Sequence, residues 1–565
     1  MAQDGDECDL LVIGSGAAGL AAAVSAAVLG LKVTLVEKER HFGGTSAWSG
    51  GWLWVPGNPL AVAAGVKEPP GAARSYLREE LGNHFEPQLV DMFLMQAPHM
   101  VAFFIRETAL SFIAGLAIPD FHDRSAGASR GGRSICAAPF DGRALGPRIK
   151  DLRLALPEIA PFGLGIAAGA DLAHFINATS DPGSFLHVTK RLTRHAADML
   201  VHQRSMQLVN GQALVARLLK AADDHGVRLI HSAPCLALTH GPEGVRGATV
   251  RLQDGPHHIA AQRGVVLACG GFPHDAARFA SLTGASVGHW SAAPRSNSGD
   301  GLALGETAGG HVRADLAAPA AWAPVSVVPH KDGTTGHFPH LVERAKPGLI
   351  MVTPQGRRFC NEADSYYDVM RALFEATPKG QAPVAFLICD QKFITRYGLG
   401  RVRPFPFPLK PWQTSGYLKS APDLAGLARA CAIDPAALTA TVEAYNESAR
   451  SGLDPQFGRG SSPYNRAGGE PLHKPNPCVA PLDYAPFHAV KVVPGSLGTF
   501  AGLATDAFAR VLDNNQQPVA GLYAVGNDMA SVMGGHYPAG GITLGPAMTF
   551  GYIAAHHAAG HELPK

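Results

Sequence analysis

The sequence has few of the cysteine patterns that mark disulfide-rich or metal-binding proteins. Its 565 residues include eight cysteines, at positions 8, 136, 235, 269, 360, 389, 431 and 478. No two are spaced as C-x-x-C, and none pairs with a histidine at the spacing of metal ligands. Dispersed thiols in a long chain are typical of a reduced, cytoplasmic enzyme. We therefore expect a cytoplasmic location and no metal site.

An excess of charge of either sign is also missing. Lys and Arg together number 48 and Asp and Glu 46, which gives a formal net charge of +2. This balance provides neither the basic field that attracts nucleic acid nor an acidic tail. We expect no nucleic-acid partner.

Long hydrophobic runs are absent as well. The longest apolar stretch, residues 17–31, is short for a membrane span and rich in Ala and Gly. The acidic first residues lack the basic and apolar regions of a signal peptide. We expect no integral membrane segment. A chain of this length with 46% hydrophobic residues instead predicts at least two globular domains.

A glycine-rich unit lies close to the N-terminus. Residues 9–13 are a short apolar run that predicts a buried strand, followed by Gly14-Ser15-Gly16-Ala17-Ala18-Gly19 and an Ala-rich helix over residues 20–29. A second apolar run, residues 32–36, ends at Glu37. The order of strand, glycine turn, helix, strand and acid is typical of a dinucleotide site.

Each part of this unit has a physical task. Gly14 permits the tight turn, Gly16 lets the backbone approach a pyrophosphate, and Gly19 lets the helix pack closely on the strand. The helix N-terminus offers free N–H groups and a positive dipole end to the phosphates. Glu37 can accept hydrogen bonds from the ribose hydroxyls.

The following residues distinguish a flavin from a nicotinamide. Residues 37–46 continue with a glycine pair and small hydroxyl residues, and they resemble the FAD-contacting segment of the fumarate reductase/succinate dehydrogenase flavoprotein superfamily. Residues 265–272 and 521–528 are similar to its later strand–glycine segments, and residues 540–547 resemble its flavin-closing helix N-terminus. The Ser-Gly-Asp-Gly turn at residues 298–301 has a counterpart near the flavin in that superfamily.

This resemblance covers nearly the full length and implies noncovalent FAD. The residues that it assigns to the cofactor are Gly14, Gly16, Ala17, Ala18, Gly19, Glu37, Lys38, Gly43, Gly44, Thr45, Ser46, Gly270, Asp300, Gly526, Asn527, Thr543 and Leu544. His41 is present where some members attach FAD covalently, but its neighbours do not match that motif. No second dinucleotide fingerprint is visible, so electrons are expected to leave for a quinone or a soluble carrier.

The resemblance also implies the fold. We expect an α/β chain with a discontinuous Rossmann-type FAD-binding domain, residues 1–272 and 495–565. An α+β substrate domain, residues 273–494, is inserted and caps the flavin. The inserted block has the size of a separate domain. The active site is expected at the junction, where ligand clefts commonly form.

Within the inserted block, Tyr366 bears on the reaction. In fumarate reductases an Asn-Glu motif is followed, five positions after the Asn, by the Arg that acts as catalytic acid; here Asn361-Glu362 is followed by Tyr366. Residues 540–552 contain no Arg, although a dicarboxylate needs bidentate donors. Reduction of a dicarboxylate is therefore disfavoured.

A tyrosine at this position resembles the 3-ketosteroid Δ1-dehydrogenase branch, and residues 531–541 are similar to its Tyr-Pro-Gly loop. By that resemblance, the Tyr537 hydroxyl and the Gly541 N–H donate to the ketone oxygen as an oxyanion hole for the developing enolate. Tyr366 removes the α-proton, flavin N5 takes the β-hydrogen as hydride, and the product is an α,β-unsaturated ketone.

The sequence departs from this branch at Phe121. In the branch, a tyrosine in a Pro-Asp-Tyr loop assists the base, whereas this chain has Pro119-Asp120-Phe121-His122. A phenol with a pKa of about 10 needs a perturbed environment to act as a base near neutral pH. We hypothesise that His122 or Tyr367 takes over this support, and we place Phe121 and Tyr367 in the substrate pocket.

The sequence thus predicts an FAD-dependent dehydrogenase that desaturates a hydrophobic cyclic ketone next to its carbonyl. The substrate is a 3-oxosteroid or a smaller ring such as cyclohexanone. Two alternatives stay open. One is an ene-reductase or fumarate reductase of the same superfamily, and the other is an FAD-binding protein that has lost catalysis.

Overall fold

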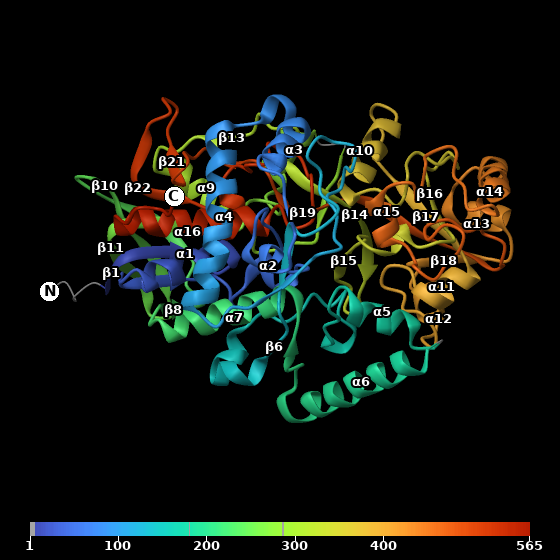
Figure 1. Cartoon of the computed structure of the whole chain (residues 1–565), viewed down its shortest axis with the longest axis horizontal. Helices are drawn as coiled ribbons and strands as arrows, with labels where there is room; N and C mark the ends of the chain where they lie inside the picture. The colour runs from blue at the N-terminus through green and yellow to red at the C-terminus, as the bar shows by residue number, and fades with distance from the viewer. Residues whose placement is uncertain (1–5, 180, 285–286) are drawn as a thin grey trace.

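The computed structural model describes residues 6–179, 181–284 and 287–565. Two β-sheets organise this part of the chain, one towards each end of the molecule in Figure 1. The first has the strand order β21-β22-β11-β1-β2-β8, with β10 and β9 added at β11. Its strands are β1 (Asp6–Ile13), β2 (Val33–Val36), β8 (Arg228–Ile230), β9 (Cys235–Gly241), β10 (Gly244–Leu252), β11 (Gly255–Leu267), β21 (Arg510–Leu512) and β22 (Pro518–Ala524).

Strands from both ends of the chain meet in this first sheet. β1 pairs in parallel with β2 and β11, and β11 pairs in parallel with β22. The apolar residues of β1 are fully buried, as a parallel strand covered on both faces requires. The predicted Rossmann-type class is confirmed: the C-terminal strand β22 joins, through β11, the sheet that contains the N-terminal strand β1.

The helices α1 (Ala17–Val28), α7 (Asn210–Asp224) and α16 (Leu544–Ala559) pack together on this sheet, with α1 between the other two (Figure 1). Small residues allow a close approach: a Cβ on Gly551 of α16 would lie 2.6 Å from the Ala18 carbonyl oxygen of α1. α1 begins at Ala17, three residues before the predicted helix start, so the glycine turn leads directly into the helix.

The second sheet is mostly antiparallel. Its order is β15-β14-β19-β17-β16, and β12 and β18 also pair with β19. Its strands are β12 (Trp290–Ser291), β14 (Ala320–Pro329), β15 (Thr335–Pro339), β16 (Leu349–Val352), β17 (Ala385–Asp390), β18 (Leu418–Ala421) and β19 (Phe487–Thr499). Helices α13 (Leu424–Cys431) and α14 (Pro435–Ala449) cover it with a second apolar cluster.

We propose that these two sheets mark the two predicted domains. β19 supports a small adjustment, because it is one continuous strand of the second sheet across the expected boundary at residue 495. We propose that the FAD-binding domain resumes after Thr499.

Further strands and helices join these layers, mostly short apart from the 21-residue α6. They are β3 (Trp52–Trp54), α2 (Pro59–Ala63), α3 (Ala72–Leu81), β4 (Phe112–Ala114), β5 (Ser134–Ala137), α5 (Ala170–Asn177), α6 (Pro182–His202), α8 (Ala276–Thr283), α9 (Asp300–Thr307), α10 (Tyr366–Ala376), α11 (Gln391–Tyr397), α12 (Lys410–Thr414) and α15 (Pro463–Gly468). The Pro-rich stretch of residues 403–412, whose composition predicts a loop, ends in a helix. α12 starts at Lys410 with Pro411 in its first turn, where the missing N–H of proline has no helical partner to lose.

Helix α4 (Pro87–Glu107) meets the length and hydropathy criteria of a membrane span, with a mean hydropathy of 1.3 in its most apolar window. Half of that window is buried, and α4 packs against α16. A buried core helix passes the same test, so α4 carries no argument for membrane insertion.

Candidate functional site

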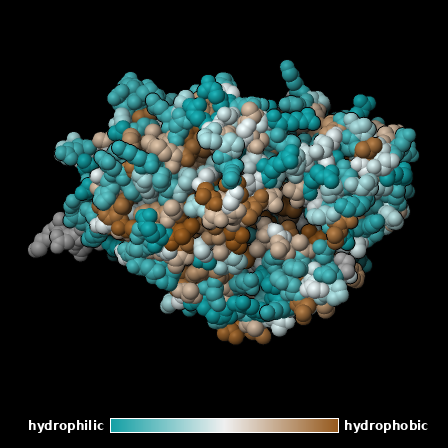
Figure 2. Space-filling view, in the orientation of Figure 1, coloured by the Kyte–Doolittle hydropathy of each residue, from teal (hydrophilic) through white to brown (hydrophobic). Residues whose placement is uncertain are grey.

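A cavity of about 730 Å³ runs between the two sheets and is lined by residues from both. Its wall extends from Ile13, at the end of β1, to Tyr366, at the start of α10. Figure 2 shows a hollow near the middle of the molecular face, with apolar residues around it. The size lies within the range of small-molecule and cofactor sites.

At one end of the cavity, backbone segments approach so closely that only glycine fits. Gly14 has a φ of +107°, and a Cβ there would lie 2.2 Å from the Ala268 carbonyl oxygen. A Cβ on Gly19 would lie 2.0 Å from the Gly14 carbonyl oxygen. The first residues of α1 line the cavity, and its N-cap Gly16 supplies no side chain to their amides. This is the geometry of a pyrophosphate site.

The acidic residue of the fingerprint lies beside this turn. Glu37 follows β2, is mostly buried, and accepts hydrogen bonds from Ser15 N–H (3.1 Å), Ser15 Oγ–H (2.6 Å) and Glu39 N–H (2.9 Å). Because each carboxylate oxygen has two lone pairs, Glu37 can still accept from ribose hydroxyls. Lys38 pairs with Asp300 at 2.6 Å across the cavity mouth. The donors and acceptors at this end fit the adenosine diphosphate part of FAD.

Towards the middle of the cavity, the segment after β22 and the N-terminus of α16 come together. Gly526, Asn527, Thr543 and Leu544 all line the cavity. Asp528, which the sequence did not single out, accepts hydrogen bonds from the N–H groups of Cys269 and Gly271. It thereby ties β22 to the glycine pair after β11. Burial raises the pKa of Asp528 to about 6.

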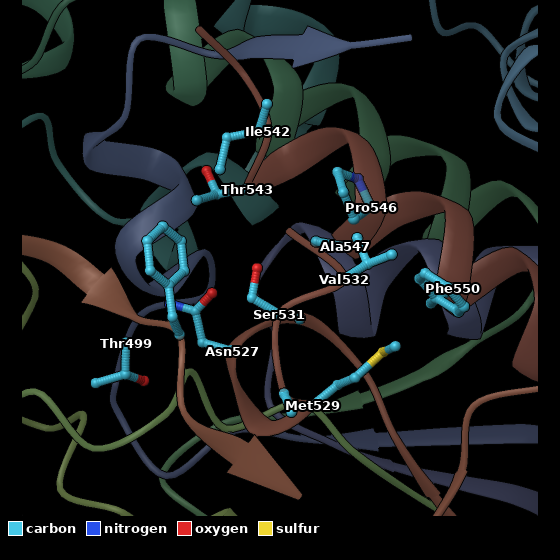
Figure 3. A pocket seen from close by; sticks show the side chains of 13 residues that line it. Thr499, Asn527, Met529, Ser531, Val532, Ile542, Thr543, Pro546, Ala547 and Phe550 are labelled. Atoms are coloured by element: carbon cyan, nitrogen blue, oxygen red, sulfur yellow. The ribbon is translucent and has the colours of Figure 1, made fainter. Parts of the chain in front are cut away.

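A second, small cavity of about 20 Å³ lies behind these residues, enough for one water molecule. Figure 3 shows Asn527, Ser531 and Thr543 around the same space. Thr499 also lines it, and its Oγ1 is buried with no hydrogen-bond partner among the described residues. These polar groups suit an ordered water.

At the other end, hydrogen bonds to backbone carbonyls hold the loop of residues 535–541. Tyr367 O–H donates to Gly535 O (2.6 Å), Tyr76 O–H donates to Pro538 O (2.7 Å), and Ser134 Oγ–H donates to Gly540 O (3.0 Å). The loop carries two of the predicted catalytic groups, Tyr537 and Gly541.

Gly541 requires the glycine backbone. Its φ is +101°, and a Cβ there would lie 2.6 Å from Trp54 N. Its carbonyl oxygen accepts from the N–H groups of Trp54 and Gly545, each at 3.0 Å. Its own N–H has no hydrogen-bond partner among the described residues and is therefore available to a ligand.

Four aromatic rings gather at this end. The rings of Tyr366 and Tyr537 are 5.0 Å apart, edge to face. Phe121 stacks on Tyr537 at 5.8 Å, meets Tyr366 edge-on at 5.7 Å, and lies 4.6 Å from the ring of Tyr464. Tyr366, Tyr464 and Tyr537 all line the cavity. Three phenols from distant parts of the chain therefore share one small volume.

The surroundings of Tyr366 disfavour its phenolate. Burial raises its pKa well above the usual 10, and the neighbouring Tyr537 and Tyr464 act in the same direction, whereas Arg344 opposes them. Burial likewise raises the pKa of Tyr537. In this structure both hydroxyls are therefore protonated near neutral pH, which suits Tyr537 as a hydrogen-bond donor.

A buried ionic cluster positions the segment before Tyr366. The Glu362 carboxylate accepts from Arg358 (2.7 Å) and Arg459 (3.2 Å), and Arg358 also pairs with Asp454 at 2.8 Å. Arg344 donates to the carbonyl oxygens of Glu362 and Asp364 on the same segment. Ser365 then caps α10 by accepting from Asp368 N–H at 3.1 Å, so that Tyr366 starts the helix.

The two residues suggested as replacements for the missing phenol are already engaged. Tyr367 O–H bonds to Gly535, and Tyr367 does not line the cavity. His122 contacts Glu80 through Nδ1 (2.5 Å) and Asp368 through Nε2 (2.8 Å). Burial lowers the pKa of His122, but the hydrogen bonds and charges of these two acids outweigh burial and raise it to about 10.

The structure brings most of the predicted site residues to the cavity. Those that line it are Gly14, Gly16, Ala17, Ala18, Glu37, Lys38, Gly44, Thr45, Ser46, Phe121, Gly270, Asp300, Tyr366, Gly526, Asn527, Tyr537, Gly541, Thr543 and Leu544. Gly19, Gly43 and Tyr367 lie behind this layer. Gly43 N–H donates to Ser15 Oγ at 3.0 Å, which links the two glycine segments.

Sequence reasoning missed two parts of the wall. One comprises apolar residues between 155 and 176, a stretch with no motif that could have indicated a pocket. The other includes Lys346, Arg403 and Tyr464 of the inserted block. The only signal for Tyr464 in the sequence was indirect: position 121 carries Phe where the related branch has a tyrosine, so another phenol was needed.

Comparisons with known proteins agree with this arrangement. A family model described as FAD binding domain matches residues 9–544. A 4-oxocyclohex-2-ene-1-carboxylate 5-dehydrogenase from Sinomonas cyclohexanicum is 39% identical over 558 residues, covering 97% of this chain and 93% of the relative. A 3-oxosteroid 1-dehydrogenase from Mycobacterium tuberculosis is 35% identical over 566 residues, covering 98% of each chain.

A solved structure is similar over the same length. The crystal structure of 3-ketosteroid Δ1-dehydrogenase from Sterolibacterium denitrificans in complex with 1,4-androstadiene-3,17-dione superposes with a TM-score of 0.90 at 34% identity. The match covers 98% of this chain and all of that one.

Proposed function

The chain belongs to the FAD-binding-domain family and is an FAD-dependent oxidoreductase, and we propose that it introduces a C=C bond next to the carbonyl of a cyclic ketone. The observation that carries this proposal is the meeting of Tyr366, Tyr537 and the free Gly541 N–H at one end of the cavity. The names of the relatives support it, since they include dehydrogenases of oxosteroids and of an oxocyclohexene carboxylate.

The cavity-lining fingerprint residues would hold FAD without a covalent bond. His41, where some flavoproteins of this type attach the cofactor, is not among the described residues that line the cavity. When bound, FAD supplies the acceptor that takes the β-hydrogen of the substrate as hydride. No second dinucleotide fingerprint is present, so we propose an external quinone or soluble carrier as the final electron acceptor.

Two donors of this chain would bind the ketone oxygen. The Tyr537 hydroxyl and the Gly541 N–H come from one loop, which the hydrogen bonds of Tyr76, Ser134 and Tyr367 hold in place. Fixed donors stabilise the negative charge that develops on the oxygen as the α-proton leaves. Such donors contribute more in a site from which water is excluded.

The α-proton would pass to the Tyr366 hydroxyl oxygen. Because burial raises the pKa of Tyr366, its phenolate does not form in advance. Removal of the α-proton must therefore coincide with release of the phenol's own proton. Tyr464 packs against Phe121 and lines the cavity with Tyr366. Burial raises the pKa of Tyr464, so it also holds its proton and acts as a relay that accepts one proton while its own hydroxyl proton leaves to solvent. We assign to Tyr464 the supporting role that the missing tyrosine at position 121 has in related enzymes.

Anaerobic mixing tests this function. Purified yellow protein is mixed with cyclohexanone, a 3-oxo-4-ene steroid or succinate, and the flavin absorbance is followed. Bleaching by either ketone is the expected result, with formation of the enone from cyclohexanone or of the 1,4-dienone from the steroid. Bleaching by succinate alone would overturn the proposal in favour of a dicarboxylate reductase. Intact FAD binding without bleaching by any ketone would favour a protein that has lost catalysis.

A further inference from the structure

An unpaired ammonium group lies on the substrate side of the cavity. Lys346 is only 8% exposed and lines the cavity wall. Its Nζ donates to the Gly469 carbonyl oxygen at 2.7 Å, and no carboxylate of the described residues lies within 4.0 Å of it. Glu470 is near enough to act through its charge, but it pairs with Arg396 at 3.2 Å. Two of the three ammonium donors are therefore available to a ligand.

A second cation lines the same cavity. Arg403 donates through Nη2 to the carbonyl oxygens of Glu158 and Ile159, and its Nε is buried with no hydrogen-bond partner among the described residues. Arg403 forms no ion pair with any of the described residues. Glu343 is the one acid beside these cations on the wall, and its carboxylate is bound by His340 at 2.6 Å.

The remaining wall here is apolar and includes Leu156, Ile159, Leu172, Ile176 and Phe338. A neutral ring satisfies these side chains but provides no ion-pair partner for either cation, and a buried unpaired charge is costly. A carboxylate on the ligand would remove that cost.

Helix α15 links Lys346 to the ketone end. Tyr464 lies in its first turn and Gly469 directly follows its last residue, so the two lie about 7.5 Å apart along the helix axis. Bond lengths of about 1.5 Å place the carboxyl group of a 4-oxocyclohexane-1-carboxylate about 6 Å from its ketone oxygen. The span of such a ring is therefore comparable to the rise of α15 between these two residues.

We propose that the cavity takes a cyclic ketone that carries a carboxylate, and that Lys346, with Arg403 on the same wall, binds this carboxylate. The inference rests on the proposed ketone desaturation and narrows its substrate class. Neutral ketones such as cyclohexanone or an oxosteroid would then still bleach the flavin, but with a higher KM than the carboxylated ring.

The test compares 4-oxocyclohexane-1-carboxylate with its neutral methyl ester. The holoenzyme is assayed as wild type and as Lys346→Gln, Lys346→Arg and Arg403→Gln. Lys379→Gln serves as the control, since Lys379 is exposed and has no ion pair among the described residues. Flavin content and melting temperature are measured for each variant.

We expect the wild type to prefer the acid over the ester. Loss of one charge-assisted hydrogen bond in Lys346→Gln should raise KM for the acid about 10- to 100-fold, with kcat and the ester reaction nearly unchanged. Lys346→Arg should retain most of the preference, and Arg403→Gln should lose less of it.

Equal kcat/KM for the acid and the ester in the wild type would overturn the inference while leaving the proposed function intact. An equal loss with both substrates in Lys346→Gln would also overturn it, because that pattern marks a structural role. If neither substrate bleaches the flavin, the proposed function fails. Calorimetric binding of unreactive cyclohexanecarboxylate then decides: weaker binding to Lys346→Gln supports the inference, and no binding to the wild type refutes it.

Discussion

The two ends of the cavity are built in different ways. The dinucleotide end comes largely from one stretch, residues 13–46, in which strand, turn and helix follow each other directly. The ketone end takes Phe121, Tyr366, Tyr464 and Tyr537 from four separate segments, which only the packing of the two sheets brings together.

This difference determines how each end tolerates change. At the dinucleotide end the contacts are between backbone atoms, so a single added carbon has no room. At the ketone end the contacts are between side chains, so a phenol absent at position 121 can be supplied from position 464. Substitutions at the dinucleotide end should therefore act through steric clash with the backbone, whereas substitutions at the ketone end should act through the loss or gain of a side-chain group.

The largest effect is expected for Gly14→Ala. The new Cβ would meet the Ala268 carbonyl oxygen at 2.2 Å, and neither backbone segment can yield without disrupting the sheet. We expect loss of FAD binding and a free energy of unfolding lower by on the order of 3–5 kcal/mol. Flavin absorbance and chemical denaturation measure the two losses.

Gly30→Ala is the matched control. Gly30 has a φ of +90°, but nothing lies within 4 Å of the added Cβ. It should lose only about 1–2 kcal/mol through backbone strain and should keep its flavin. Similar behaviour of the two variants would show that backbone conformation, rather than close approach, determines the sequence of the turn.

Tyr366→Phe should reduce turnover next most strongly. Loss of a proton-transfer group typically slows a reaction about 10²- to 10⁴-fold. The ring contacts with Phe121 and Tyr537 are preserved, so FAD content and the melting temperature should remain as in the wild type. Stopped-flow flavin reduction measures the rate. A decrease below about threefold would mean that another group takes the α-proton.

Glu362→Gln should destabilise the chain by about 3 kcal/mol, because it leaves buried guanidinium charges of Arg358 and Arg459 undercompensated. Burial raises the pKa of Glu362, but these two arginines outweigh burial and hold it below its ordinary value of 4.5.

The sign of the pH dependence follows from this lowered pKa. The contribution of Glu362 is present above pH 4.5 and is lost as the pH falls through the folded-state pKa. The difference in melting temperature between wild type and Glu362→Gln should therefore shrink on acidification. A difference that stays constant as the pH falls from 7 to well below 4.5 would contradict an ionic role.

The smallest effect is expected when the phenol is moved from position 464 to position 121. Tyr464→Phe should slow flavin reduction about tenfold and shift its pH profile, and adding Phe121→Tyr should restore both, since the two rings are 4.6 Å apart. Tyr484→Phe, at an exposed position, is the control. If Tyr464→Phe behaves as the wild type while His122→Ala or Tyr367→Phe is slow, the support comes from one of those residues instead.

Much of the fold could be predicted from the sequence. The glycine turn and the apolar runs at residues 9–13 and 32–36 appear as β1, α1 and β2, because each depends on neighbours within a few residues. The Ser-Gly-Asp-Gly turn at residues 298–301 leads into α9 (Asp300–Thr307). The short helix at Lys410 could not be predicted, because the Pro-rich composition of residues 403–412 favours a loop, whereas a single proline in a first turn permits a helix.

Only those residues of the candidate site that belong to a sequence motif could be predicted. Tyr366, Tyr537 and Gly541 were found through resemblance, and the structure brings all three to the same cavity. Tyr464 and Lys346 belong to no motif. Their positions depend on α15, a six-residue helix of the inserted block that packs beside the segment before Lys346.

The sequence by itself determined the cofactor end, because short-range sterics and an exposed helix terminus suffice to make a pyrophosphate site. The tertiary structure alone decided which side chains face the ketone and which charges remain unpaired around it. Phe121 and Tyr464 are separated by more than 300 residues, and only the packing of the two sheets places their rings 4.6 Å apart. No periodicity in the sequence encodes a distance of that kind.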